Sequence, residues 1–442
     1  MACGSRRGLS LIWHSICLAP ASHESVSPAT RLPLAGLLIA LALAGCSASS
    51  TTVPSTAGTT PVQSPNASPG SQDSANVGQG TAVTWQTGDL TLPTAFQFEQ
   101  LVPIGDRLYL IASDLGGGDA TVKASGGIWA SADGLTWTKQ SGIDAVKSPG
   151  ADRPTLVAAS PNGRGGAVIV GSEQATDGTD RTAAWWTTDG KTWGNASIEG
   201  PAGRMLSVAG RPDGLVAVGI SFSSVPGGSS EAAAWHSTDG GSSWTSVSLP
   251  GGGREARDVT VWGDRFVAIG LSSDSYQLML WTSSDGASWS LTQSPSDPSF
   301  APFHLIPLGN TLVVLGWGVP GSAILTCGND MTCARASVPG LGYAASITRV
   351  RSGAEVSGTI VVNAQSGIAG TAASPGPSAN PAQGNEFLAS TDGRTWTTLK
   401  SDPSLVVVTS NLVVFRGRLV AVAFAGPNPT AAIVTAVVGE LR

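Results

Sequence analysis

The stretch WHSTDGGSSW, from Trp235 to Trp244, decides the fold because near-copies of it recur along the chain. The copies are WASADGLTW from Trp129, WWTTDGKTW from Trp185, WTSSDGASW from Trp281 and LASTDGRTW from Leu388. A degenerate copy, ILTCGNDMTC, places Cys327 where the others have Ser or Thr. Aligned on that residue, successive copies are 56, 50, 46, 44 and 63 residues apart. Repetition at this period is typical of propellers and solenoids.

A second pattern precedes each copy: a short apolar run, a tight turn and another apolar run. Examples are LVPIGDRLYLIAS at residues 101–113 and VTVWGDRFVAIGLS at residues 259–272, and seven such pairs occur. Short apolar runs bounded by Gly, Asp, Asn and Pro are typical of strands in an antiparallel meander. Each unit is therefore predicted to hold four strands, A to D, with the aspartate-containing turn between C and D.

The seventh unit lacks a strand D, because it stops at a C-like run, AAIVTAVVG, at residues 431–439. The segment AVTWQ at residues 82–86 is a candidate for the missing strand. Its Trp85 matches the tryptophans of the other D strands, which are Trp137, Trp193, Trp244, Trp289 and Trp396. We expect an all-β fold, a seven-bladed β-propeller of four-stranded antiparallel blades in which the N-terminal strand completes the last blade. Such closure removes exposed sheet edges.

The repeated S-x-D-G-x-T-W turns resemble the Asp-box, or BNR repeat, of the sialidase superfamily, over residues 81–442. The fuller family spacing, S-x-D-x-G-x-S-W, occurs only from Ser237 to Trp244, and the other copies are one residue shorter. The resemblance implies the propeller fold. It does not imply one activity, because the same box occurs in sialidases, other glycosidases, sorting receptors and photosystem assembly factors. We expect a non-catalytic member of this group.

The residues of the turn have a structural explanation. Asp can accept hydrogen bonds from the backbone of its own turn, Gly supplies a positive φ, and Ser or Thr caps the turn. We therefore expect a structural role, in preference to binding of Ca²⁺ or another ligand, for the five aspartates. They are Asp133, Asp189, Asp239, Asp285 and Asp392.

The degenerate copy has Cys327 and Cys333 on either side of the same turn. In an oxidising compartment a disulfide between them would hold the hairpin where the tryptophan packing is lost. The alternative is a metal site, but no His or further Cys lies near in the sequence. We expect the disulfide, no metal and no cofactor.

The topology of a meander directs the search for a ligand site away from the aspartate turns. The A–B and C–D connections share one end of each blade, and the more variable B–C and D–A loops share the other. Function tends to lie on variable loops carried by a rigid scaffold. The residues just before each strand A should ring the channel mouth at that end. They are Glu99, Arg153, Arg204, Arg257, His304, Arg349 and Asn411.

Four arginines in this set suit an anionic ligand, because guanidinium groups bind carboxylate, sulfate or phosphate. The alternative is that the arginines pair with Glu99, Glu255 and Asp258 and only solvate the rim.

The resemblance also implies a catalytic alternative. In sialidases three arginines clamp a carboxylate, a glutamate activates a tyrosine nucleophile, and an aspartate is the acid/base. The corresponding candidates here are Tyr343, Glu255 and Asp258. The chain departs from the family pattern, because the folded part lacks the N-terminal Arg-Ile-Pro and the last blade has no tyrosine. These departures favour binding over catalysis.

The segment RLPLAGLLIALALAGC, residues 31–46, has the order of a signal peptide, with Arg31, an apolar centre and small residues. Its apolar part is too short for a spanning helix, which needs about 20 residues. Its end, Leu43 to Cys46, resembles the lipobox of bacterial lipoproteins, which implies cleavage before Cys46 and lipidation of its thiol. The alternative is an ordinary secretory signal with an incidental cysteine.

We divide the chain accordingly. A signal peptide is expected at residues 29–46, and residues 1–28 before it are a mis-assigned start or an extended n-region. Residues 47–80 are rich in Ser, Thr, Pro and Gly and are expected to form a disordered tether. The propeller is expected at residues 81–442.

Composition narrows the classes of function further. The formal net charge is −6 and only 12% of residues are charged, so the chain has no basic stripe of the kind that nucleic-acid binding needs. We expect a monomer on the outer face of the cell membrane, held by a lipid at Cys46. Its propeller would bind a glycan, a cell-wall component or a protein. The alternative is a sialidase-like glycoside hydrolase with an arginine-lined site at the channel mouth.

Overall fold

The computed structural model describes thirteen segments of the chain. They are residues 82–90, 98–114, 125–176, 178–223, 228–275, 277–292, 300–318, 321–338, 349–365, 385–401, 405–408, 411–425 and 433–441. They belong to one compact unit, Gly78–Arg442. Within these segments no helix is long and apolar enough to cross a membrane. The apolar segment at residues 31–46 lies outside them.

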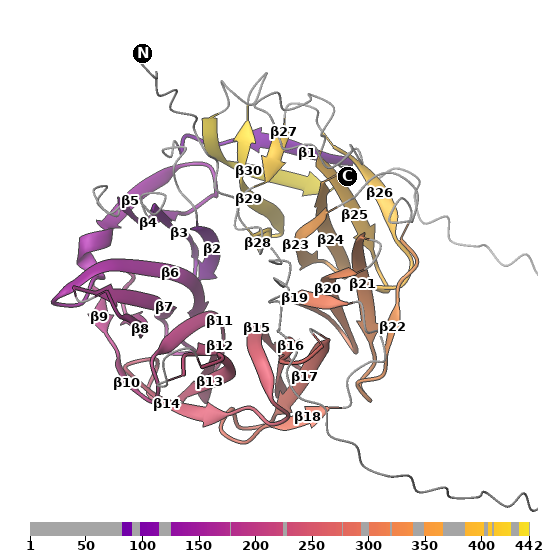
Figure 1. Cartoon of the computed structure of the whole chain (residues 1–442). Coiled ribbons are helices and arrows are strands. Elements are labelled where there is room, and N and C mark those ends of the chain that lie inside the picture. The colour runs from indigo at the N-terminus through magenta and orange to yellow at the C-terminus, as the bar shows by residue number, and fades with distance from the viewer. Residues whose placement is uncertain are drawn as a thin grey trace, which may run out of the picture. The chain divides into compact units, whose positions relative to one another are not determined.

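The structure confirms the predicted fold, a β-propeller of seven four-stranded antiparallel blades (Figure 1). Blade 1 is β2 (Phe98–Ile104), β3 (Arg107–Asp114), β4 (Ser125–Ser131) and β5 (Trp137–Gly142), followed by a short 3-10 helix at Ile143–Ala145. Blade 2 is β6 (Ala151–Pro161), β7 (Ala167–Ala175), β8 (Asp180–Thr187) and β9 (Gly194–Asn195). Blade 3 is β11 (Gly203–Arg211), β12 (Gly214–Ser221), β13 (Glu231–Ser237) and β14 (Ser243–Ser248), and β10 (Ser197–Glu199) pairs outside β14.

The later blades repeat this order. Blade 4 is β15 (Gly253–Trp262), β16 (Arg265–Ser272), β17 (Leu278–Ser283) and β18 (Ser290–Thr292). Blade 5 is β19 (Ala301–Leu308), β20 (Thr311–Gly318), β21 (Gly321–Cys327) and β22 (Cys333–Arg335). Blade 6 is β23 (Arg349–Val356), β24 (Thr359–Gln365), β25 (Asn385–Ser390) and β26 (Thr397–Ser401).

Blade 7 joins the two ends of the folded unit. Its inner edge is β27 (Leu405–Val408) and β28 (Val413–Phe415), which both pair with β29 (Arg418–Ala425), and β30 (Ile433–Leu441) follows. The outer strand is β1 (Ala82–Thr87), which pairs antiparallel with β30 and places Trp85 opposite Gly439. β1 also pairs in parallel with β26 of blade 6. The N-terminal strand therefore completes the last blade, as the sequence predicted.

The hydrophobic core consists of layers between neighbouring blades. The second strand of each blade has a continuous apolar run in its middle, and both faces of this run are covered by neighbouring blades. In β16, Val267 and Ile269 pack toward blade 5, while Phe266 and Ala268 pack toward blade 3. These four side chains are fully buried. Because side chains alternate along a strand, a strand buried on both faces needs a continuous apolar run.

Candidate functional site

The two ends of the blades differ in what they carry. We call the end with the A–B and C–D connections the turn face, and the opposite end the loop face. All five aspartate-containing turns lie on the turn face, because each joins the third and fourth strands of a blade. Residues 115–124 and 366–384, which connect β3 to β4 and β24 to β25, lie outside the described residues.

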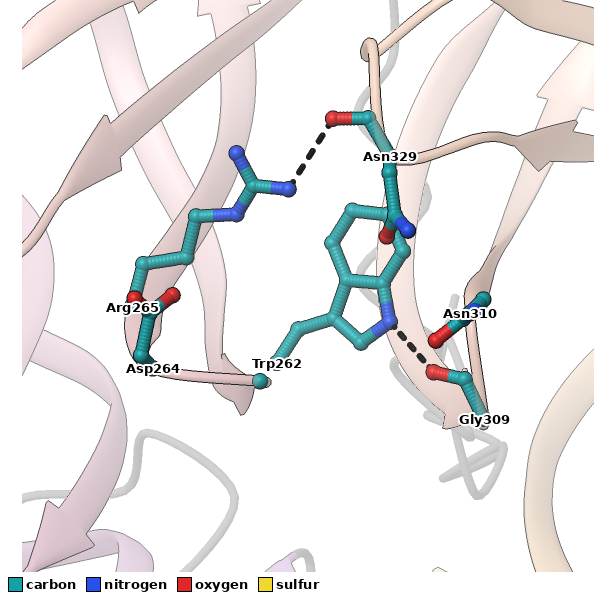
Figure 2. Close-up of a pocket in the computed structure, with 7 residues that line it drawn as sticks. Trp262, Asp264, Arg265, Gly309, Asn310 and Asn329 are labelled. Carbon is teal, nitrogen blue, oxygen red and sulfur yellow. Dashed lines mark hydrogen bonds between the residues drawn. The ribbon is translucent and has the colours of Figure 1, made fainter.

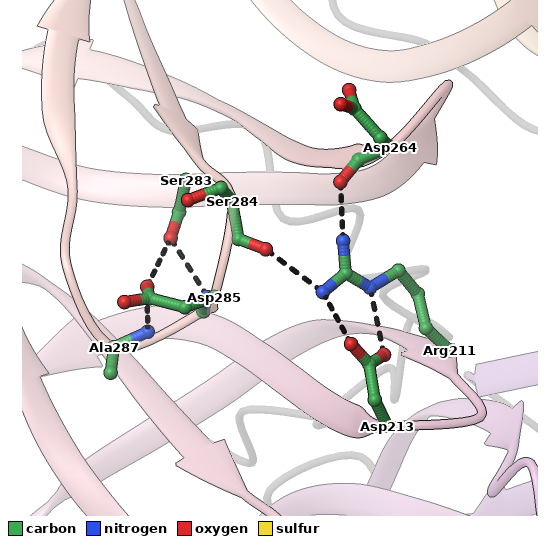
Figure 3. A network of polar contacts seen from close by, with 8 residues as sticks. Arg211, Asp213, Asp264, Ser283, Ser284, Asp285 and Ala287 are labelled. Carbon is green, nitrogen blue, oxygen red and sulfur yellow. Dashed lines mark hydrogen bonds and ion pairs between the residues drawn. The ribbon is translucent and has the colours of Figure 1, made fainter.

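Each aspartate turn is closed by its own side chains, as the Asp285 turn shows (Figure 3). Ser283 Oγ donates to Asp285 Oδ1 at 3.0 Å, and the amide of Gly286 donates to Ser283 Oγ at 2.8 Å. The amide of Ala287 donates to the same carboxylate oxygen at 2.9 Å. The indole of Trp289 donates to the Gly286 carbonyl at 3.0 Å. Two of these hydrogen bonds recur at the turns of Asp133, Asp189, Asp239 and Asp392. The Ser or Thr hydroxyl donates to the aspartate, and the glycine amide donates to the hydroxyl.

These contacts keep the turn carboxylates ionised. The amides of Ser288 and Ala287 lower the pKa of Asp285 to about 2, and those of Thr192 and Lys191 lower the pKa of Asp189 to about 2. Hydrogen bonds that favour the charged form have this effect on a carboxylate. A group with so low a pKa holds no proton near neutral pH, so neither aspartate could serve there as a general acid.

The glycine of each turn also contacts the preceding blade. A Cβ on Gly286 would meet Val216 Cγ2 of blade 3 at 2.6 Å, and one on Gly393 would meet Val313 Cγ2 of blade 5 at 2.7 Å. The same close approach occurs at Gly134, Gly190 and Gly241. The repeated motif therefore forms contacts between blades as well as within its own hairpin.

Arginines of the turn face extend these contacts from blade to blade. Arg211, at the end of β11, donates to the Ser284 carbonyl at 2.9 Å and to the Asp264 carbonyl, and it pairs with Asp213 at 2.9 Å (Figure 3). Its guanidinium also lies 4.5 Å from the centroid of the Phe266 ring. Four other arginines donate to turn carbonyls of the following blade. They are Arg164, Arg265, Arg416 and Arg418.

Most of the residues that were predicted to precede strand A, on the loop face, lie within that strand. The reason is that the first strand of each blade begins before its apolar run. Arg153 lies in β6, Arg204 in β11, Arg257 in β15, His304 in β19 and Glu99 in β2. Arg349 begins β23, while Asn411 lies two residues before β28. β-Bulges interrupt β11, β15 and β19 near these positions. Arg204 precedes its bulge, Arg257 lies within one and His304 follows one, so the residues do not occupy equivalent register positions.

Two of the predicted rim arginines are paired with acids of the chain. Arg204 lies 3.4 Å from Asp180, and both side chains are partly exposed. Arg257 forms an ion pair with Glu255 and donates to the Pro302 carbonyl at 3.2 Å. This is the pairing of Glu255 that the alternative interpretation of the rim predicted. An anionic ligand would have to displace these carboxylates.

Asp258 is the most connected polar residue of this region. Its Oδ1 accepts Ser207 Oγ at 2.6 Å and the Val259 amide at 2.9 Å. Its Oδ2 lies 2.8 Å from His304 Nδ1 and accepts the Leu305 amide at 2.8 Å. Asp258 therefore joins the inner strands of blades 3, 4 and 5 across the channel wall.

An equivalent contact joins blade 7 to blade 1 and so closes the ring. Asn411 Oδ1 accepts the Leu101 amide at 2.7 Å, and Asn411 Nδ2 donates to the Leu101 carbonyl at 2.9 Å. Asn411 and Asp258 each directly precede the apolar run of an inner strand, and Leu101 and Leu305 each begin the run of the next blade. Asn411, Asp258 and His304 were candidates predicted from the sequence, but Ser207 and these contacts between blades were not.

Ser207, Asp258 and His304 are not arranged as a catalytic triad. In a catalytic triad the histidine lies between the serine and the aspartate, so that it can take the serine proton. Here Asp258 lies between Ser207 and His304. Tyr343, the candidate nucleophile of the sialidase alternative, lies outside the described residues, and Glu255 is paired with Arg257.

His304 has a raised pKa in this setting. Burial lowers the pKa of the imidazole, but the Asp258 carboxylate and a hydrogen bond with the Gly353 backbone raise it more. An acidic partner at this distance stabilises the imidazolium. The ring therefore connects Asp258 of blade 4 to the Gly353 backbone of blade 6.

The degenerate turn of blade 5 is held covalently. A disulfide joins Cys327, at the end of β21, to Cys333, at the start of β22. The positive φ that glycine supplies in the other turns is taken here by Met331, at 62°. The Met331 side chain is buried in the layer that contains Trp262. In the segments that the structure describes, no group of three or more His, Cys, Asp or Glu could hold a metal ion.

A pocket of about 380 Å³ lies on the turn face between blades 4 and 5 (Figure 2). Its lining includes Trp262, Asp264, Arg265, Asn310 and Asn329. The Trp262 indole donates to the Gly309 carbonyl at 2.9 Å, and Arg265 donates to the Asn329 carbonyl at 3.0 Å. This pocket was not predicted from the sequence, which favoured ligand binding at the opposite end of the blades. The signal available was the Gly-Asp-Arg turn at residues 263–265 and the degenerate copy that follows it.

Comparison with known proteins adds little to this description. No family model and no curated protein matches the chain. Among solved structures, a streptogramin B lyase is similar at 10% identity and a TM-score of 0.49, covering 81% of this chain and 98% of that one. A protein of unknown function from Dyadobacter fermentans DSM 18053 is similar at 12% identity and a TM-score of 0.43, covering 82% and 98%. Neither likeness is strong enough to bear on function.

Proposed function

We propose that the chain is an exported lipoprotein, anchored to the outer face of the cell membrane through Cys46, whose propeller is a binding scaffold. The ligand is a glycan, a cell-wall component or a protein partner. The observation that carries the proposal is the sequence order: a lipobox-like Leu43–Cys46, a segment poor in large apolar residues, and then the propeller. This order would hold a rigid domain away from the membrane on a flexible tether.

Two structural features support this proposal. The Cys327–Cys333 disulfide suits an exported protein, because disulfides persist in oxidising compartments and are rare in the cytosol. The polar side chains around Asp258 are hydrogen-bonded to one another and to the backbone of neighbouring blades. Such groups stabilise the scaffold and are not free to act on a substrate, which favours binding over catalysis.

The anchor is tested by expressing the full chain in a bacterial host that is fed radiolabelled palmitate. We expect label in the membrane fraction with the wild type and none with Cys46→Ser, which should be released or keep its signal peptide. Cys17→Ser is the matched control, because it removes another N-terminal cysteine outside the lipobox, and it should be labelled like the wild type. Equal labelling of Cys46→Ser and the wild type would contradict the anchor.

The scaffold is tested with the detergent-purified full chain. We expect it to be retained on isolated cell walls, a glycan array or a partner protein, and to release no dye from a panel of fluorogenic glycosides. Turnover of a sialoside in this panel would contradict the proposal and favour the glycosidase alternative. Absence of retention on all three classes of ligand would also contradict it.

A further inference from the structure

The pocket lies at the junction of blades 4 and 5. This junction differs from the five junctions that have an aspartate turn, because the C–D turn of blade 5 is degenerate. At five junctions the glycine of the aspartate turn packs closely against the preceding blade. A Cβ added to this glycine would lie less than 3 Å from an atom of that blade at four junctions, and 3.1 Å from one at Gly134. These junctions therefore have little room between the turn and the preceding blade. Blade 5 has no such glycine contact in its described turn, and the buried Met331 side chain stands there instead. A pocket of about 380 Å³ lies at this junction, and Asn329 of the same turn lines it.

The walls of the pocket are held in place. Arg265 lies with its guanidinium 5.0 Å from the centroid of the Trp262 ring, and its bond to the Asn329 carbonyl ties it to the disulfide-closed turn. Trp262 is only 3% exposed and is fixed by its bond to Gly309. The volume falls within the range of roughly 300–1,000 Å³ typical of small-molecule sites. The pocket is therefore preformed.

The exposed side chains at the rim offer both donors and acceptors. Asp264 supplies a carboxylate, and Asn310 and Asn329 each supply an amide that both donates and accepts. No hydrogen bond joins these three side chains to other groups in the described part of the chain, so they are open to a ligand. Figure 2 shows them around the Trp262 ring together with the Arg265 guanidinium.

The charges select the chemical class of the ligand. The lining carries one carboxylate and one guanidinium, so an anion would face Asp264 and a cation would face Arg265. An apolar ligand would leave several polar groups without partners, which is costly. A neutral molecule with many hydroxyl groups would satisfy donors and acceptors together.

We propose that this pocket binds a neutral saccharide, with its hydroxyl groups on Asp264, Asn310 and Asn329. This inference rests on the proposed function as a binding scaffold and names one ligand class for it. It also places that ligand on the turn face, away from the arginines of the loop face.

The chain contains a matched control turn. Ile104-Gly105-Asp106-Arg107 in blade 1 repeats the Gly-Asp-Arg of Trp262-Gly263-Asp264-Arg265 in blade 4. The two glycines have similar φ angles of 59° and 64°, and Asp106 is exposed like Asp264. Asp106→Ala therefore makes the same chemical change in the same kind of turn, outside the pocket.

The test uses the detergent-purified full chain on an array of neutral and acidic oligosaccharides, followed by calorimetry with the best neutral binder. We expect Asp264→Ala and Asn329→Ala each to weaken binding at least tenfold, with an unchanged Tm, and Asp106→Ala to bind like the wild type. Asn329→Ala keeps the carbonyl that Arg265 contacts, so the wall should remain in place.

Equal affinity of the wild type, Asp264→Ala and Asn329→Ala would overturn the pocket assignment and leave the scaffold proposal standing. Binding of acidic saccharides alone, or of no saccharide, would overturn the ligand class. In those two cases, retention of the wild type on cell walls or on a protein would still support the scaffold proposal. The experiment therefore distinguishes failure of the saccharide proposal from failure of the scaffold proposal.

Discussion

Gly286 of blade 4 lies so close to Val216 of blade 3 that a Cβ at Gly286 would be 2.6 Å from Val216 Cγ2. Gly286 also has a φ of 78°, a conformation that other residues adopt at a cost. The glycine of the repeated turn is therefore required twice, once by its own hairpin and once by the neighbouring blade.

Gly286→Ala should separate these two requirements when it is compared with Gly105→Ala. Gly105 has a φ of 59° and no atom within 4 Å of an added Cβ, so its substitution should cost only the left-handed conformation, about 1–2 kcal/mol. Gly286→Ala should cost about 1–3 kcal/mol more, because the extra carbon overpacks the junction. Urea unfolding followed by tryptophan fluorescence measures both. Similar midpoints for the two variants would show that the junction yields without strain.

Asp258→Ala should be among the most destabilising single substitutions of the inner strands. It leaves Ser207, His304 and the Leu305 amide without their shared acceptor. Leaving a buried donor without its acceptor costs about 1–3 kcal/mol for each group. Asp106→Ala, at an exposed turn, should change the free energy of unfolding by less than about 0.5 kcal/mol. A loss at Asp258 no larger than that at Asp106 would contradict the role of Asp258 in joining three blades.

The raised pKa of His304 predicts a pH dependence of stability. Burial opposes protonation of the ring, but Asp258 and the Gly353 backbone outweigh it, so the folded pKa exceeds the unfolded value of 6.5. The folded state therefore holds the proton more tightly than the unfolded state. The resulting stabilisation is complete below pH 6.5 and is lost as the pH rises through the folded pKa. Urea midpoints measured from pH 5.5 to 9 should fall in the wild type, and His304→Gln should remove that part of the fall.

The turn aspartates predict the opposite dependence at low pH. The pKa of Asp285 is lowered from 3.8 to about 2, so its contribution is present above pH 3.8 and is lost as the pH falls through 2. Asp285→Asn should therefore have a lower Tm than the wild type at pH 6, and the difference should shrink toward pH 2. Asp106→Asn is the control and should follow the wild type throughout. A constant difference between Asp285→Asn and the wild type would mean that the charge of Asp285 is not what stabilises the turn.

The Cys327–Cys333 disulfide closes a loop with a sequence separation of 6. Loop-closure entropy for so short a loop gives a stabilisation of about 2 kcal/mol. The double variant Cys327→Ser/Cys333→Ser should lose about this much, and reduction of the wild type should lower its Tm to that of the variant. Because the closed turn carries Asn329, the variant should also weaken saccharide binding. Equal stability of the variant and the oxidised wild type would contradict the role of the disulfide.

The sequence determined the repeat, the strand order and the closure of the ring, because these depend on signals within a few residues. The aspartate turn is closed by groups two to four residues apart, so its pattern alone identified the C–D hairpins. Trp85 identified β1 as the last D strand, since every other D strand of that pattern has the same tryptophan.

Only the tertiary structure decided how neighbouring blades meet. Asp258 and His304 are 46 residues apart in the sequence, and Val216 and Gly286 are 70 residues apart, so no local pattern links them. The β-bulges in β11, β15 and β19 fall at equivalent register positions, and Arg204 precedes its bulge, Arg257 lies within one and His304 follows one, which a count along the sequence could not foresee. The pocket beside Trp262 is lined by turns of two blades, residues 262–265 of blade 4 and Gly309, Asn310 and Asn329 of blade 5, and contacts between such distant residues are fixed only when the ring closes.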